Sequence, residues 1–273
     1  DRWINAAILS SLTGRIGDFL AGMIANGVHL APFEVNDIMA SAIEISGTTK
    51  DANGIAAAIT LIKKGATARD KFRATLALGT GLRRAKSDFA KFDSDGIVKR
   101  LLLQARAAAM GEDDGIRTNA IACLTFADFE QVDQTLYSLL DQQHPQTVQL
   151  TALNTLDQFS AGPIAPEIIR RWQSFTPAVR NEAMRVLLRR TSHTLALLLA
   201  IERGTMMPSD LPFNRRASLP RHRDKQIQSA AKRILGQQTL SSRADALKKF
   251  RPALRLTGIP TAGRKVYEER CQT

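Results

Sequence analysis

Cysteine and histidine are the side chains of this 273-residue chain most able to do chemistry of their own, as nucleophiles, bases or metal ligands. The four histidines lie far apart in the sequence, at His29, His144, His193 and His222. None of them falls in the H-x-x-x-H or H-E-x-x-H spacing of a metal site. The sequence also has neither the G-x-S-x-G turn of a serine hydrolase nor a phosphate-binding P-loop. We therefore expect neither a catalytic residue nor a metal ligand in this chain.

Two further residue groups have a structural explanation that is simpler than a chemical one. Cys123 precedes Leu124 in a stretch with helical periodicity, which predicts a buried and unreactive thiol. Asp113 and Asp114 stand where a helix is expected to begin, so they balance the helix dipole instead of forming an acid/base pair.

A group of basic residues, which we call the basic cluster, is the main candidate for a partner-binding surface. The cluster lies in a long connection that begins at Gly204 and is interrupted by prolines. Long connections in compact helical proteins often carry function. A solvated charged loop would have the same composition, so the sequence leaves both interpretations open. The members of the basic cluster are Arg215, Arg216, Arg221, Arg223 and Lys225.

The formal net charge is +12, but it is distributed unevenly. Residues 204–273 contain 15 Lys and Arg against 5 Asp and Glu, whereas residues 112–169 contain 1 against 9. A groove that follows a nucleic-acid backbone would favour continuous positive potential. The acidic block therefore argues against nucleic acid as a partner, and a basic nucleic-acid-binding repeat protein is kept as the alternative function.

A recurring helical phrase organises the chain: a large aliphatic residue, an alanine four positions later, and a leucine four positions after that. Such spacing places all three on one helix face, with the alanine allowing a neighbouring helix to approach closely. One helix cannot bury this stripe alone, but stacked copies can. The phrase occurs at Ile116-Ala120-Leu124, Val148-Ala152-Leu156, Val179-Ala183-Leu187 and Ile227-Ala231-Leu235.

Hardly any stretch alternates apolar and polar residues as an exposed strand would, so we expect an all-α fold. Asp51 and Thr176-Pro177 have the composition of helix starts. Ser94 or Asp95 should cap a helix that ends near Met110, and Gly79-Thr80-Gly81 is a point where the helix over 70–92 could kink or stop. The other expected helices span about 3–12, 15–26, 33–46, 52–64, 114–126, 128–141, 146–159, 164–174, 177–191, 193–203 and 242–251.

Residues 1–257 resemble the HEAT-type repeats, whose second helices have the pattern V-R-x-x-A-x-x-x-L. Val179-Arg180-Asn181-Glu182-Ala183 and Ile116-Arg117-Thr118-Asn119-Ala120 match it best. The resemblance implies an α-α superhelix, a HEAT/armadillo-like solenoid of about six to seven helix pairs.

The C-terminal residues have the pattern G-x-x-V-Y-x-x-x-C, formed by Gly263, Val266, Tyr267 and Cys271. This pattern resembles the opening helix of a c-type cytochrome domain, so residues 258–273 read as a linker and the truncated start of such a domain. In that family C-x-x-C-H follows, where two thiols bond the haem and His binds iron. We expect the natural protein to continue with Cys-His. Cys271 would attach haem c only in that case, and no cofactor is expected in the present residues.

The order of helical repeats, the segment Ser242–Leu254 and a cytochrome start is similar to large exported proteins of planctomycete-type bacteria. These are the PVC-type haem-binding or membrane-bound dehydrogenase-like proteins. The resemblance implies a non-catalytic scaffold, spacer and interaction module in the periplasm or cell envelope. Its partners would be the flanking domains, a β-propeller and a cytochrome, together with an acidic redox partner or envelope polymer. We expect no membrane span, because no apolar run approaches the roughly 18 residues that one requires.

Overall fold

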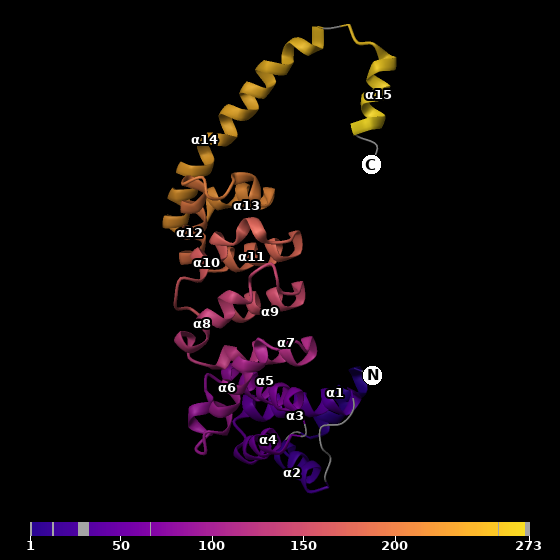
Figure 1. Cartoon of the computed structure of the whole chain (residues 1–273), viewed down its shortest axis with the longest axis vertical. Coiled ribbons are helices and arrows are strands. Elements are labelled where there is room, and N and C mark those ends of the chain that lie inside the picture. Colours follow the sequence, from indigo (N-terminus) through magenta and orange to yellow (C-terminus); the bar gives the residue numbers. More distant parts are fainter. Residues whose placement is uncertain (1, 13, 27–32, 66, 256, 271–273) are drawn as a thin grey trace. The chain divides into compact units, whose positions relative to one another are not determined.

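The computed structural model of the chain describes residues 2–12, 14–26, 33–65, 67–255 and 257–270 (Figure 1). All regular secondary structure in these ranges is helical, so the expected all-α fold is confirmed for the described residues. Within the same ranges, none of the helices combines the length and the apolar character needed to cross a bilayer.

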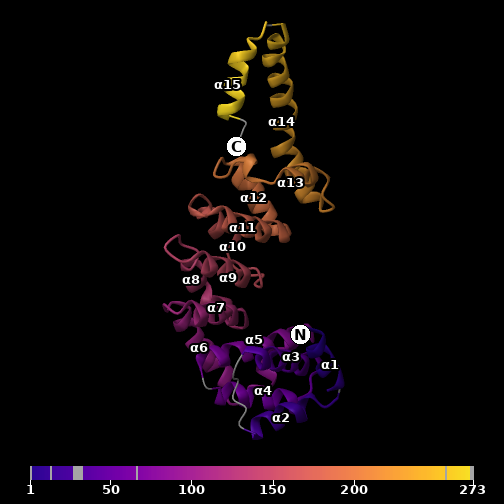
Figure 2. The same ribbon diagram turned by 90° about the vertical axis from the view of Figure 1, so that its right-hand side faces the viewer.

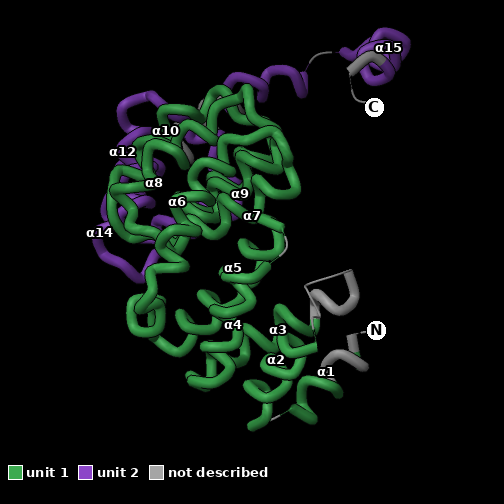
Figure 3. The backbone as a smooth tube through the Cα atoms, turned by 60° about the horizontal axis from the view of Figure 1, so that its bottom comes forward, with its two compact units in different colours: residues 1–189 green, residues 190–273 purple. Residues whose placement is uncertain are grey.

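The chain divides into two compact units, Asp1–Arg189 and Arg190–Thr273 (Figure 3). The first unit consists of α-helices joined by short 3-10 helices. Its α-helices are α1 (Arg2–Ser11), α2 (Ile16–Ala25), α3 (Phe33–Thr49), α4 (Ala52–Lys64), α5 (Ala68–Arg84), α6 (Ile97–Ala109), α7 (Asp114–Cys123), α8 (Phe129–Ser138), α9 (Gln146–Leu156), α10 (Ile164–Arg170) and α11 (Pro177–Arg189). Its 3-10 helices are η1 (Phe89–Lys91), η2 (Leu124–Phe126) and η3 (Trp172–Ser174).

Helix packing in the first unit becomes regular from α5 onward (Figure 2). Helix α7 packs on α5, α9 packs on α7, and α11 packs on α9, while α6, α8 and α10 cover α7, α9 and α11. The alanines in the recurring phrase, Ala120, Ala152 and Ala183, are fully buried. Their missing side-chain bulk lets each helix approach the next, as the sequence pattern predicts.

Several helix starts agree with the sequence. The Asp51 carboxylate accepts a hydrogen bond from the Asn53 amide at 3.2 Å. The Asp113 carboxylate accepts from the amides of Gly115 and Ile116 at 2.9 and 3.1 Å. Helix α11 begins at Pro177, and the Val179 amide donates to the Thr176 hydroxyl at 3.4 Å. These side chains satisfy amides that have no partner within the helix.

The start of α6 differs from the expectation that Ser94 or Asp95 caps it. The helix begins at Ile97, and the Asp93 carboxylate accepts from the amides of Val98 and Lys99 at 3.0 and 3.1 Å. Gly96 makes this possible because it adopts the left-handed conformation, with φ of 64°. A residue with a side chain rarely takes that conformation, so the glycine directs the chain back over the earlier carboxylate.

The helix does not stop at Gly79-Thr80-Gly81, because α5 continues through both glycines; it ends at Arg84, before the expected residue 92. The glycines serve close packing instead. A Cβ atom at Gly81 would lie 2.1 Å from the carbonyl oxygen of Glu44 on α3, and one at Gly79 would lie 2.4 Å from the Phe126 ring. Helix α5 therefore keeps its hydrogen bonds and uses the missing side chains to receive its neighbours.

The second unit contains α12 (Thr191–Glu202), α13 (Phe213–Ser218), α14 (Lys225–Phe250) and α15 (Pro260–Arg270). Its 3-10 helices are η4 (Pro208–Asp210), η5 (Leu219–Arg221) and η6 (Arg251–Arg255). Helix α12 packs on α14, and the Asp224 carboxylate joins their starts by accepting from the Gln226 amide at 2.9 Å and the Thr191 hydroxyl at 3.0 Å. The separate helix expected from Ser242 is absent, since α14 runs unbroken over that position. No proline interrupts residues 225–250, and a single glycine costs a helix only about 1 kcal/mol.

Candidate functional site

The cysteine that the structure describes is structural. Cys123 is buried, and its thiol donates a hydrogen bond to the Phe72 carbonyl at 3.0 Å. Burial raises the pKa of the Cys123 thiol, which disfavours the reactive thiolate. The predicted burial is thus confirmed. Cys271, the proposed haem attachment residue, lies outside the described residues, as does His29.

His144 takes part in a contact that ties two helix junctions together. Its Nδ1 atom lies 2.8 Å from Nη2 of the buried Arg117, whose Nε donates to the Ala109 carbonyl at 3.0 Å. Arginine can only donate, so Nδ1 accepts and the imidazole is neutral at this atom. Burial, together with the charge of Arg117, lowers the pKa of His144. The pair holds the end of α6 and the start of α7 against the turn before α9.

The two other histidines that the structure describes lie in helix α12 and between η5 and α14. His193 is buried in α12, and Nδ1 of His222 accepts from the Asp224 amide at 3.1 Å. Within the part of the chain that the structure describes, no three His, Cys, Asp or Glu residues come close enough to hold a metal ion.

The structure places the basic cluster on consecutive elements that pack against one another. Arg215 and Arg216 lie on α13, Arg221 ends η5, Arg223 lies in the following turn, and Lys225 begins α14. All are exposed except Arg216, which is half-buried. Helices α13 and α14 both contact η5, so the cluster is part of a folded segment.

Carboxylates near the basic cluster are engaged elsewhere. The Asp210 carboxylate accepts from the Met207 amide at 2.7 Å. The Asp224 carboxylate caps α14, and the hydrogen bond from the Gln226 amide, followed by that from Thr191, lowers its pKa. Among the described residues, no Asp or Glu oxygen lies within 4.0 Å of a cationic nitrogen of the basic cluster. The positive charge of this surface is therefore available to a partner.

An exposed aromatic side chain lies beside one of these arginines, Arg216. Phe213 is 80% exposed, and the guanidinium carbon of Arg216 lies 5.9 Å from its ring centroid. Met207 on the same connection is exposed as well. Arginine, aromatic residues and methionine are enriched in protein interfaces, where arginine and aromatic side chains often dominate the binding energy. The sequence analysis singled out the arginines but not Phe213, although Phe213 lies two residues before Arg215.

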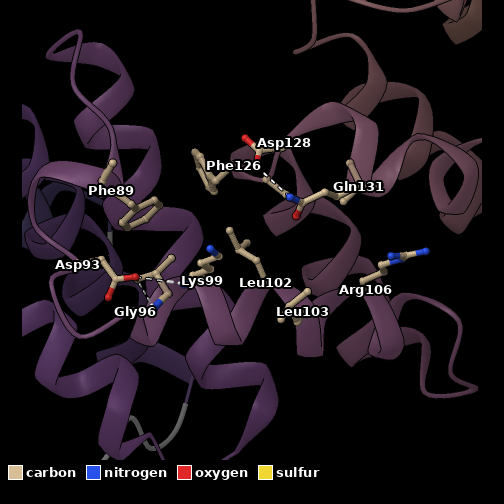
Figure 4. Close-up of a pocket in the computed structure, with 14 residues that line it drawn as sticks. Phe89, Asp93, Gly96, Lys99, Leu102, Leu103, Arg106, Phe126, Asp128 and Gln131 are labelled. Atoms are coloured by element: carbon tan, nitrogen blue, oxygen red, sulfur yellow. Dashed lines mark hydrogen bonds between the residues drawn. The ribbon is translucent and has the colours of Figure 1, made fainter.

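A cavity lies entirely in the first unit, between η1–α6 and η2–α8 (Figure 4). Its volume is about 310 Å³, and we call it the α6 cavity. Its apolar lining includes Phe89, Leu102, Leu103, Phe126 and Val132, and its polar lining includes Asp93, Lys99, Arg106, Asp128 and Gln131. Sequence reasoning missed this cavity because its walls come from segments separated by up to about forty residues.

A more open hollow of about 570 Å³ lies between α5, η2 and α9. Here Arg83 donates to the carbonyl and hydroxyl oxygens of Thr125 at 2.7 and 3.1 Å, and to Gln158 at 3.2 Å. Its guanidinium carbon lies 4.8 Å from the Phe126 ring centroid. Burial lowers the pKa of Arg83, but an arginine stays protonated in any case. Because the Arg83 side chain already makes these contacts, we interpret this pocket as a junction between packed helices.

Comparisons of the chain with protein-family models, with curated proteins and with solved structures found no match.

Proposed function

We propose that this chain is a non-catalytic helical-repeat scaffold whose basic cluster binds an acidic partner. The observation that supports this most directly is the exposed Phe213 ring beside Arg216, in a cluster whose cations have no carboxylate partner in the described residues. An exposed aromatic ring contributes apolar area at low entropic cost, and unpaired guanidinium groups attract and orient carboxylates.

The scaffold role has separate support in the first unit. Successive helices α5, α7, α9 and α11 pack in order, and polar side chains join neighbours. The Thr155 hydroxyl on α9 donates to the Ile121 carbonyl on α7 at 3.2 Å. Arg185 on α11 binds Asp157 at the end of α9 at 2.9 Å. We propose that these contacts belong to a HEAT-like superhelix of about six to seven helix pairs.

The wider context that we propose is an exported, haem c-containing, dehydrogenase-like protein of the periplasm or cell envelope, with the flanking domains as further partners. Its support is the cytochrome-like pattern of Gly263, Val266 and Tyr267 on α15, followed by Cys271. A haem stain on a longer chain that includes the residues after Thr273 tests this context. An unstained product, or the absence of Cys-His after Thr273, would remove it.

Association kinetics with poly-L-glutamate test the basic cluster. The variant Arg215→Glu with Arg221→Glu should lower the association rate about tenfold or more at low salt, because steering by charge acts mainly on this rate. Phe213→Ser should mainly speed dissociation. The matched control is Lys248→Glu with Lys249→Glu, which changes the charge of the same unit equally at exposed positions outside the cluster. Equal losses in both double variants would contradict a specific surface, and an unchanged rate would remove the proposal.

Nucleic acid is the alternative partner, and Phe213 is also the observation that favours it. An exposed aromatic ring beside arginine can stack on a base. Retention on DNA at about 50 mM salt with a steep salt dependence would support this alternative. Absence of retention under the same conditions would dismiss it.

A further inference from the structure

We propose that residues 247–255, which we call the tip, bind to the surface of an anionic lipid bilayer. The tip consists of the last turn of α14 and the 3-10 helix η6, so it lies in the second unit. It shares no residue with the basic cluster, and the proposal therefore does not rest on the proposed function. The tip also ends before α15, so it is independent of the haem context proposed for the C-terminal residues.

The first argument is the exposure of the tip. Helix α14 begins as a core helix, because Ile227 and Leu235 in its first half are buried. At the tip, by contrast, every residue is exposed. The exposed fractions of its large apolar residues are 63% for Leu247, 65% for Phe250 and 88% for Leu254. A group of exposed large apolar residues marks a surface that interacts with a protein or a membrane.

The second argument is the charge of the tip. Its cations are Lys248, Lys249, Arg251 and Arg255. The longer stretch 246–267 contains six Lys and Arg and no Asp or Glu. Among the described residues, no carboxylate lies within 4.0 Å of a cationic nitrogen of the tip. The tip therefore matches a negatively charged surface, whereas a second copy of the tip would be repelled.

The third argument is that apolar and cationic side chains project from different sides of the last turn of α14. Leu247 and Phe250 are spaced i and i+3, so they lie on one side of this turn. Lys248 and Lys249 fall between them in the sequence, so they project from its other sides. The Lys249 ammonium lies 5.9 Å from the Phe250 ring centroid, which keeps one cation beside the apolar pair. An apolar side flanked by cations is the arrangement of helices that lie in a membrane interface.

The fourth argument distinguishes a bilayer from an acidic peptide. Peptide segments bind by placing their apolar side chains in a groove. The apolar side chains of the tip are themselves the projecting partner, because more than half of the surface of each is open. A bilayer receives such side chains at the boundary between headgroups and acyl chains, and anionic headgroups add attraction for Lys and Arg. This chemistry selects an anionic lipid surface.

The probe is a set of unilamellar vesicles of phosphatidylcholine with about 30% phosphatidylglycerol, an anionic lipid. The readout is the fraction of the full chain that sediments with the vesicles. Binding should be at least about tenfold weaker to vesicles of phosphatidylcholine alone, because the cations of the tip then lose their attraction. Binding to the anionic vesicles should also fall as the salt concentration rises from about 0.05 to 0.5 M, since the Debye length shortens.

Two double variants test the two parts of the tip. Leu247→Ser with Phe250→Ser should lower the partition coefficient about tenfold or more, because the apolar side no longer inserts. Lys248→Gln with Lys249→Gln should lower it about tenfold, because each cation near the surface adds attraction. All four positions are exposed, so the variants should fold, and the thermal midpoint of each checks this.

A matched control removes equal charge elsewhere in the same unit. Arg215→Gln with Arg221→Gln changes exposed positions of the basic cluster. It should alter the partition coefficient less than about twofold, because charges outside the contact act only through a screened field. This control also separates the two proposals. The basic-cluster variant should weaken binding of poly-L-glutamate, whereas the tip variants should weaken binding of vesicles.

Three results would overturn the proposal. The first is an absence of sedimentation with anionic vesicles at lipid concentrations up to about 5 mM, beyond the millimolar end of the affinity scale. If the tip then binds poly-L-glutamate, its partner is an acidic protein instead of a bilayer. The second is undiminished binding of Leu247→Ser with Phe250→Ser, which would reduce the interaction to attraction between charges. The third is an equal loss of vesicle binding in the basic-cluster variant.

Discussion

The arginines that join helices in the first unit play a different part from the arginines of the basic cluster in the second unit. In the first unit they connect helices: Arg171 binds Asp141 at 2.8 Å and also pairs with Glu167, while Arg185 binds Asp157 and Glu182. In the second unit Arg233 pairs with Glu202 in the same way, but the arginines of the basic cluster have no such carboxylate among the described residues. These arginines are exposed except for the half-buried Arg216, which lies beside Phe213. An arginine joins helices where a carboxylate of a neighbouring helix lies within reach. Where the described residues offer no such carboxylate, as in the basic cluster, the charge of the arginine is available for binding.

Asp157 provides the sharpest test of the structural part. Its carboxylate is fully buried and pairs with both Arg185 and Arg189, whose side chains are 45% and 49% exposed. Asp157→Ala should lower the free energy of unfolding by about 2–4 kcal/mol, somewhat less than for a fully buried pair because the arginines can hydrate. Urea denaturation measures the change.

Its control comes from the second unit. Arg215→Ala should change the free energy of unfolding by no more than about 0.5 kcal/mol, as is usual for an exposed side chain without fixed partners. Equal effects of the two substitutions would erase the distinction between the two sets of arginines.

Glycine packing gives the next largest effect. Gly79→Ala should destabilise the first unit by about 1–3 kcal/mol, because the new Cβ would lie 2.4 Å from the Phe126 ring. Gly236→Ala in α14 meets open space, so it should stabilise the protein by about 0.4–1 kcal/mol. Calorimetry distinguishes a loss from a gain. A stabilising Gly79→Ala would show that Phe126 yields, and that the wall of the α6 cavity is not rigid.

The pH dependence of one ion pair should have the smallest effect. Hydrogen bonds from Arg170 and Arg171 lower the pKa of Glu167. A lowered folded-state pKa stabilises the protein above the unfolded value of about 4.3 and loses this stabilisation as the pH falls. The stability difference between wild type and Glu167→Gln should therefore be under about 1 kcal/mol at pH 6 and shrink toward pH 3. A difference that grows on acidification would contradict this assignment.

Local signals in the sequence predicted much of the helical framework. Asp51, Asp113 and Thr176-Pro177 cap the helices that they were expected to begin. Such predictions succeed because a cap and its amides lie within a few residues of each other. The start of α6 was mispredicted because Gly96 turns the chain back toward Asp93, and the sequence does not show which carboxylate then reaches the amides.

Features that depend on contacts distant in the sequence could not be predicted. The glycines of α5 look like a helix break until Glu44 and Phe126 are seen against them. The α6 cavity depends on Phe89 and Phe126, which no local pattern connects. The basic cluster was visible as composition, but only the structure shows that the carboxylates of Asp210 and Asp224 are engaged elsewhere.

The buried thiol of Cys123 gives the first unit a built-in reporter of its own opening. Its sulfur touches the Phe72 carbonyl, so an alkylating reagent reaches it only when α7 separates from α5. The rate at which the thiol is modified would then measure how often α7 transiently separates from α5, where the regular succession of helices begins.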